Sequence, residues 1–286
     1  MPHEKHLLAS LYPDISRNTT WWFELGMPGS TKTSTGKVVF ELIATRNGGV
    51  RDISIEYLEM SKLIGVEIGS KSILGQQLVE EDAKMKAGGL GSDAPVMETF
   101  ARHVRRLYEN GVRTFFADGC VRTINQAQSV VNAQLKWNLM YFKTQETVSL
   151  ERIRRRALKE NRLDDAKPET VKNRLHQYQD QTFPVLGFFQ GIAAKRVHTI
   201  DAQYEFRKRV KMYLEFMGFS PEEVRVMLIN LHLEGHPAHI IMMEALREAP
   251  HAAHAEHSVN GHDNGRQTQI HSPTAAVHHP AAFATP

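Results

Sequence analysis

Near its start the chain has an apolar, aromatic run of strand length, followed at once by a glycine-rich turn and a helical segment. The run is Thr20 to Leu25, and the sequence GMPGSTKTSTGKVVFELIATR follows it. Glycines let such a turn direct its backbone N–H groups inward, so that a helix N-terminus and a lysine can meet phosphate charge. This order of elements predicts a phosphate-binding loop within an α/β fold.

The loop keeps most of the pattern G-x-P-G-S-G-K, but Thr31 replaces the glycine before the lysine. A β-carbon at this position either narrows the loop or requires positive φ from a β-branched residue, which costs free energy. An ordinary strand–turn–helix connection with an incidental lysine is the alternative interpretation. The residues predicted to bind the donor phosphates are Gly26, Pro28, Gly29, Ser30, Thr31, Lys32, Thr33 and Ser34.

Composition limits the number of domains and the classes of partner. A chain of 286 residues with 41% apolar content suits one α/β domain with additions, or at most two domains. The net charge of +3 does not indicate general nucleic-acid binding. No segment contains the run of about 18 consecutive apolar residues that is needed to span a bilayer. The single cysteine, Cys120, excludes an intrachain disulfide, and the N-terminus lacks the plan of a signal peptide. We therefore expect a cytoplasmic protein with neither nucleic-acid nor membrane partners.

A second informative segment runs from Glu151 to Phe189, where arginines recur around an acidic pair. Several guanidiniums on one segment repel one another unless an anion lies among them, and the guanidinium fork matches phosphate oxygens in pairs. A solvated, charged helix face is the alternative. The arginines are Arg152, Arg156, Arg162 and Arg174, and the acidic pair is Asp164–Asp165.

The sequence R-x-D-D-x-x-x-E-T-V-x-x-R-L-x-x-Y-x-x-Q-T-x-P, from Arg162 to Pro184, resembles the segment after the lid in adenylate kinases and related nucleoside monophosphate kinases. Matches extend from about Trp21 to Arg209. The resemblance implies an α/β, P-loop NTPase-type three-layer sandwich with a mainly parallel five-stranded sheet, a small helical acceptor-binding domain and a short lid. It also implies phosphoryl transfer from ATP with Mg²⁺ to a nucleoside monophosphate, with AMP as the default acceptor.

By the same resemblance, the segment D-G-C-V-R-T-I-N-Q-A would hold the metal and the acceptor. Asp118 would organise Mg²⁺ through water at the end of a strand, Arg122 would clamp the acceptor phosphate, and Gln126 would read the acceptor base. A helix N-cap is the alternative for Asp118, and a surface ion pair is the alternative for Arg122. Arg152 would lie over the donor base. The implied catalytic residues are Lys32, Arg122, Arg156, Arg162 and Arg174, and the implied acceptor-binding residues are Ile55, Met60, Leu78, Gly119, Arg122, Gln126, Arg162 and Arg174.

The acceptor motif departs most from the family pattern I-S-T-G-D-x-L-R. Ile55 and Met60 stand where the threonine and the arginine would contact the monophosphate, and Glu56 replaces the glycine. Three functions therefore stay open. The chain is a nucleoside monophosphate kinase, a kinase with a different acceptor, or a kinase-like protein that binds nucleotide without efficient catalysis.

The resemblance and the composition together divide the chain. We expect an N-terminal arm at 1–19 and a kinase-like domain at 20–219, with an acceptor-binding insert at about 52–95 and a short lid at about 152–164. Residues 88–95 are expected to form a loop without a nucleotide role. A capping box at Ser220–Glu223 predicts an extra helical segment at 220–249 that packs on the body or on a protein partner. A disordered tail rich in His, Ala and Pro is expected at 250–286.

Overall fold

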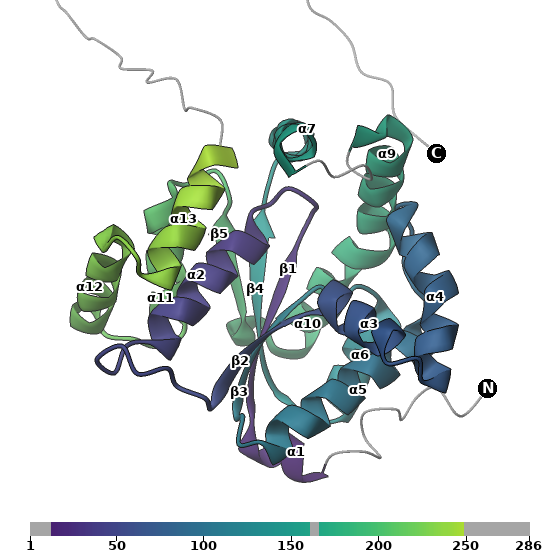
Figure 1. The fold of residues 1–286 in the computed structure, drawn as a ribbon, viewed down its shortest axis with the longest axis horizontal. Helices are drawn as coiled ribbons and strands as arrows, with labels where there is room; N and C mark the ends of the chain where they lie inside the picture. The colour runs from purple at the N-terminus through teal and green to yellow at the C-terminus, as the bar shows by residue number, and fades with distance from the viewer. Residues whose placement is uncertain (1–12, 161–165, 249–286) are drawn as a thin grey trace, which may run out of the picture. The chain divides into compact units, whose positions relative to one another are not determined.

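The computed structural model describes residues 13–160 and 166–248. Its central feature is a five-stranded sheet in the order β2-β3-β1-β4-β5, with every pairing of these strands parallel (Figure 1). The strands are β1 (Thr20–Gly26), β2 (Ile55–Glu59), β3 (Thr114–Asp118), β4 (Lys136–Lys143) and β5 (Val197–Asp201). The predicted α/β fold with a five-stranded parallel sheet is confirmed.

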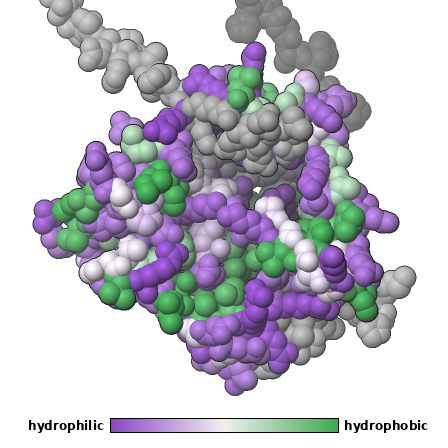
Figure 2. Space-filling model, viewed as in Figure 1, coloured by the Kyte–Doolittle hydropathy of each residue, from purple (hydrophilic) through white to green (hydrophobic). Residues whose placement is uncertain are grey.

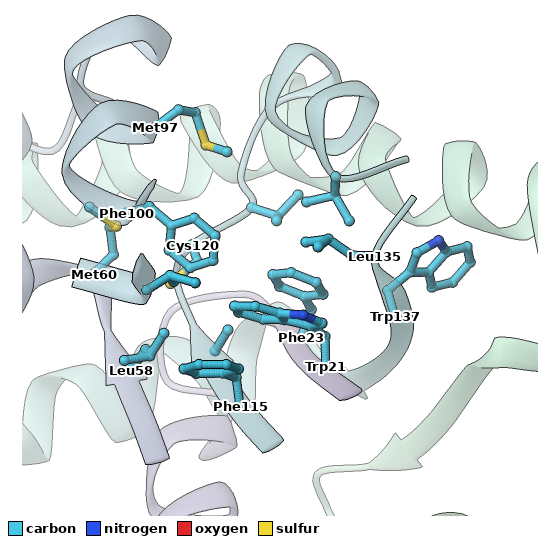
Figure 3. Packing of buried hydrophobic residues seen from close by; sticks show 14 of the residues in the cluster. Trp21, Phe23, Leu58, Met60, Met97, Phe100, Phe115, Cys120, Leu135 and Trp137 are labelled. Atoms are coloured by element: carbon cyan, nitrogen blue, oxygen red, sulfur yellow. The ribbon is translucent and has the colours of Figure 1, made fainter. Parts of the chain in front are cut away.

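The central strands are apolar along most of their length because helices cover both faces of the sheet. In β1 every residue after Thr20 is buried. Its side chains alternate between the two faces, so Trp21 packs with Phe115 on one side while Trp22 packs with Phe116 in the cluster on the other side. The rings of Trp21 and Phe115 stack with their centroids 4.3 Å apart (Figure 3).

Two groups of helices supply the outer layers. One core joins the sheet to α3 (Met60–Gly69), α4 (Ile73–Lys86), α5 (Asp93–Glu109), α6 (Ile124–Asn132) and α10 (Phe183–Ala193). The opposite core joins it to α2 (Lys32–Ala44), α11 (Phe206–Phe216), α12 (Pro221–Ile229) and α13 (Pro237–Glu248). Among the described residues, the other α-helices are α1 (Pro13–Asn18), α7 (Glu146–Glu160) and α9 (Pro168–Gln177). A π-helical turn at Tyr178–Thr182 connects α9 to α10, and short 3-10 helices lie at Ala194–Arg196 and Asn230–His232.

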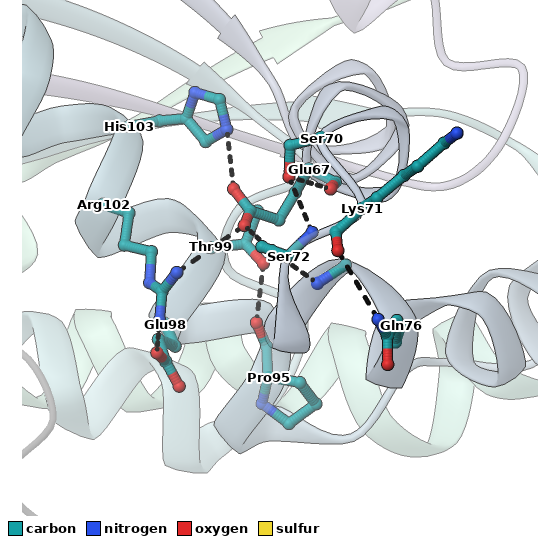
Figure 4. A network of polar contacts seen from close by, with 11 residues as sticks. Glu67, Ser70, Lys71, Ser72, Gln76, Pro95, Glu98, Thr99, Arg102 and His103 are labelled. Atoms are coloured by element: carbon teal, nitrogen blue, oxygen red, sulfur yellow. Dashed lines mark hydrogen bonds and ion pairs between the residues drawn. The ribbon is translucent and has the colours of Figure 1, made fainter.

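The helices α3, α4 and α5 are held together by a polar network around Glu67 (Figure 4). Glu67 Oε1 accepts a hydrogen bond from Ser72 Oγ at 2.6 Å, and Ser72 also caps α4 by accepting from the Gly75 N–H at 2.9 Å. From α5, Arg102 Nη1 and His103 Nε2 each lie 3.7 Å from the Glu67 carboxylate. One buried glutamate therefore fixes the three helices relative to one another.

The C-terminal helices pack on the same side of the sheet as α2. The predicted capping box is present at the start of α12, where Ser220 and Glu223 bond to each other's backbone N–H groups. The helix α13 runs beside α2, and His236, just before it, lies with its Nε2 3.0 Å from Thr45 Oγ1 (Figure 1). In the part of the chain that the structure describes, no helix combines the length and the hydrophobicity needed to cross a membrane.

Candidate active site

The carboxyl ends of the central strands open into a cleft of about 1690 Å³. The loop after β1 lines it, together with the first turns of α2 and α3, parts of α7 and α9, and the last turns of α13. In Figure 2, which views the molecule from the same side as Figure 1, the surface is hollowed near the middle of this face, and both hydrophilic and hydrophobic residues lie beside the hollow. Open parallel sheets bind their ligands at this edge, beyond the carboxyl ends of the strands.

The loop after β1 contains two residues with positive φ. Gly29 has φ +78° and Thr31 has φ +63°, one of the two outcomes expected for a β-carbon at position 31. A threonine in this conformation is costly, and hydrogen bonds on its hydroxyl offset the cost. Thr31 Oγ1 donates to the Ser30 carbonyl oxygen at 2.5 Å and accepts from the buried guanidinium of Arg209. The helix α2 begins at Lys32, so its N-terminus adjoins the loop.

Three acidic side chains lie in register on three adjacent strands where the sheet meets the cleft. Glu24 of β1 and Glu59 of β2 are both register partners of Asp118 of β3, and we call these three residues the carboxylate row. The helix α2 supplies two ammonium groups to it. Lys32 Nζ lies 3.2 Å from Asp118 Oδ1, and Lys37 Nζ lies 2.9 Å from Glu59 Oε1. The first turns of α2 therefore pair with the ends of β2 and β3.

Asp118 is a buried but ionised carboxylate. Burial alone would raise its pKa, but the charge of Lys32, a hydrogen bond from Thr33 and the charge of Arg122 together lower the pKa below its ordinary value. Thr33 Oγ1 donates to Asp118 Oδ2 at 2.5 Å. An ionised carboxylate beside a phosphate loop is an oxygen ligand of the kind that Mg²⁺ uses, directly or through water. The side chains present thus fit a magnesium site.

Glu24 lies beneath the loop and is fully enclosed. It accepts hydrogen bonds from the hydroxyls of Tyr57 at 2.7 Å and Tyr213 at 3.1 Å. Burial and the nearby charge of Asp118 raise the pKa of Glu24 well above 4.5. Glu24 is therefore neutral over a wider pH range than an exposed glutamate. Its hydrogen bonds connect β1 to β2 and to α11.

The raised pKa of Glu24 predicts a pH-dependent stability. The unfolded chain releases this proton above about pH 4.5 whereas the folded chain keeps it, so the free energy of unfolding should fall as the pH rises from there towards the folded pKa. Glu24→Gln cannot titrate, and urea unfolding should therefore show that it loses less stability than the wild type between about pH 5 and pH 8. Glu109→Gln, at an exposed carboxylate of α5, is the matched control and should follow the wild-type curve. Parallel pH curves for Glu24→Gln and the wild type would contradict the prediction.

Most of the predicted site residues lie along the cleft. Among the described residues these include every donor-phosphate residue of the loop. They also include Met60, Asp118, Gly119, Arg122, Gln126, Arg152, Arg156 and Arg174. Arg162, Asp164 and Asp165 lie outside the described residues.

Two predicted acceptor residues need correction, because Ile55 and Leu78 belong to the hydrophobic cores instead. Ile55 is 7% exposed at the start of β2, four residues before the end of the strand, and Leu78 is fully buried on the core face of α4. The strand ends at Glu59, so Glu59, Ser61 and Lys62 line the cleft there. Residues 88–91, for which no nucleotide role was predicted, also line it.

Arg152 and Gln126 are both engaged by backbone groups. Arg152 Nη2 donates to the Ala202 carbonyl at 2.8 Å and Nη1 to the Gly29 carbonyl at 3.4 Å, so it bridges the loops after β1 and β5. Gln126 Oε1 accepts from the Arg122 N–H at 2.7 Å. Cys120 is 1% exposed, and burial raises the pKa of its thiol.

Comparison with known proteins gives a consistent set of relatives, although no family model matches the chain. The adenylate kinase of Xylella fastidiosa (strain M23) is 29% identical over 171 residues, which are 58% of this chain and 83% of that protein. Adenylate kinase isoenzyme 1 of Caenorhabditis elegans is 28% identical over 171 residues, 59% of this chain and 74% of its own length. The adenylate kinase of Leptospira biflexa serovar Patoc (strain Patoc 1 / Ames) is 28% identical over 178 residues, which are 60% of this chain and 87% of that protein.

Among solved structures, a sugar kinase from Janibacter sp. HTCC2649 matches with a TM-score of 0.42 and 13% identity. The match covers 72% of this chain and 98% of that one. A similarity at this level is too low to bear on function.

Proposed function

The chain is a relative of the adenylate kinases, and from this premise we propose that it transfers the γ-phosphoryl group of ATP to a nucleoside monophosphate, AMP by default. The observation that carries the proposal is the Lys32–Asp118 pair, which lies at the end of a glycine-rich loop in a cleft that several arginines line. Phosphoryl transfer depends on positioning and charge neutralisation, and this cleft holds the groups for both.

The donor side of the cleft is the loop after β1 with Lys32 and Arg152. Backbone N–H groups of the loop and the N-terminus of α2 bind the phosphates, and Lys32 adds a positive charge to the transferring group. Mg²⁺, when bound, neutralises charge on the phosphate oxygens. Asp118 would hold it, and Lys32 would exchange its pairing with Asp118 for a phosphate oxygen.

The acceptor side requires cations more than an acid or a base. A phosphate monoester has a second pKa near about 6, so an acceptor oxygen is already deprotonated at neutral pH and attacks the γ-phosphorus directly. The bond from the γ-phosphorus to its bridging oxygen breaks, and the products are ADP and a nucleoside diphosphate. Arg122, Arg156 and Arg174 line the cleft where they could neutralise charge on the transferring group and the acceptor.

The test is the steady-state formation of ADP from ATP and Mg²⁺ with AMP, CMP, UMP or GMP as the acceptor. We expect turnover in the range of about 1–100 s⁻¹ with at least one of them, and none when EDTA removes the metal. ATP binding without turnover on any of the four would overturn the proposal.

A further inference from the structure

One cluster of charged side chains in the cleft belongs to none of the sequence motifs described above. Lys37 of α2 and Lys62 of α3 both contact Glu59 at the end of β2, with Nζ–Oε1 distances of 2.9 and 2.5 Å. All three side chains line the cleft, and we call them the lysine clamp. The Glu59 side chain is 15% exposed, Lys37 is 28% exposed and Lys62 is 69% exposed, so a partly buried carboxylate lies between two cations that a ligand can reach.

The lysine clamp lies beside the proposed transfer site. Glu59 is the register partner of Asp118, and neighbouring strands are about 4.8 Å apart. Lys37 follows Lys32 by five residues on the same helix, a rise of about 7.5 Å. A phosphate on the clamp would therefore lie on the side of the cleft next to a phosphoryl group held by Lys32.

The charges of the clamp suit a phosphate ligand. Two ammonium groups share one carboxylate, which leaves a formal charge of +1, and each ammonium carries three N–H donors. An ammonium can therefore bond to Glu59 and to a phosphate oxygen at the same time. Lys62 is largely exposed, so its pair with Glu59 should contribute little to stability.

We propose that Lys37 and Lys62 bind the phosphate of the acceptor, a nucleoside phosphomonoester, and replace the arginine that the sequence lacks at Met60. Glu59 anchors both ammonium groups at the strand end. The inference rests on the proposed function and specifies the acceptor side of the same site.

The first experiment measures KM for AMP and for ATP in Lys37→Ala, Lys62→Ala and the double variant. Loss of a charged hydrogen bond corresponds to an increase of about tenfold to a hundredfold in KM for AMP, with KM for ATP unchanged. Lys211→Ala is the matched control, because Lys211 also pairs with a glutamate, Glu215 at 3.6 Å, but lies outside the cleft. Turnover with an unchanged KM for AMP in the double variant would overturn the inference while leaving the proposed function intact.

The second experiment measures the binding of AMP and of adenosine by titration calorimetry, without turnover. Wild-type protein should bind AMP more tightly than adenosine, and this difference should be smaller in the double variant. This result without any turnover would support the lysine clamp and reject the proposed function. A wild-type KM for AMP in both single lysine variants and in the double variant would overturn the inference.

Discussion

Lys32→Ala is expected to lower kcat for phosphoryl transfer by about 100- to 1000-fold, the usual effect of removing one preorganised donor from a developing charge. Lys32 lies at the first position of α2 and pairs with Asp118 at 3.2 Å, so the variant would lose the proposed phosphate ligand and the partner of the proposed metal-binding carboxylate. Coupled detection of ADP at saturating ATP and AMP measures the effect.

The control for Lys32→Ala separates chemistry from folding. Loss of Lys32 leaves the buried carboxylate of Asp118 with one partner fewer, so urea unfolding must first establish that the variant is folded under the assay conditions. A kcat within about twofold of the wild type in a folded variant would remove Lys32 from the transfer step, because one donor should account for far more.

Gly36→Ala is expected to destabilise the fold by about 2–3 kcal/mol and to lower activity with it. A β-carbon at Gly36 would lie 2.5 Å from Glu24 Cδ and closer still to its Oε1. Glu24 cannot move away, because it is buried and bonded to two tyrosines. The helix α2 must therefore shift, and Lys32 and Lys37 would shift with it. Urea unfolding and kcat measure the two effects.

Gly187→Ala is the matched control for Gly36→Ala. It is also a helical glycine, on α10, but a β-carbon there meets no atom within 4 Å. The alanine should leave stability unchanged or raise it by about 0.5–1 kcal/mol, because alanine loses less backbone entropy than glycine in a helix. Equal stability of the two variants would contradict the close approach of α2 to Glu24.

The sequence was sufficient to predict the fold class and many of the residues that line the cleft. The strand, the glycine-rich turn and the helix after Thr20 follow one another along the chain, so the sequence alone predicts them. Asp118 and Arg122 were placed because a short motif fixes their spacing at the end of one strand. These features depend on neighbours along the chain, which a sequence displays directly.

Ile55 and Leu78 were assigned to the acceptor site because the sequence alone locates neither the end of β2 nor the side of α4 that faces the core. Only the pairing with β3 fixes that β2 ends at Glu59. Without that end, the residues that face the cleft cannot be separated from those that face the core. Similarly, α4 turns Leu78 into the core because Leu74 and Leu78 form its apolar stripe.

Two parts of the site depend on contacts between distant segments. The carboxylate row needs the strand order β2-β3-β1, and the lysine clamp needs α2 to cross the end of β2. One signal was available in the sequence, since Glu24 is a charged residue inside an otherwise apolar strand. A buried ionisable side chain of this kind is rare without a partner or a function. The contribution of α13 to the cleft, through Ile241, Glu244 and Ala245, had no such signal.

The most direct test of the central claim follows the phosphoryl group itself. ATP labelled on the γ-phosphate is mixed with protein, Mg²⁺ and excess unlabelled AMP, and the nucleotides are separated after a single turnover. We predict that the label appears in ADP and that little of it appears as free phosphate. Label that stays in ATP, or that appears only as free phosphate with each of the four monophosphates, would contradict transfer to a nucleoside monophosphate.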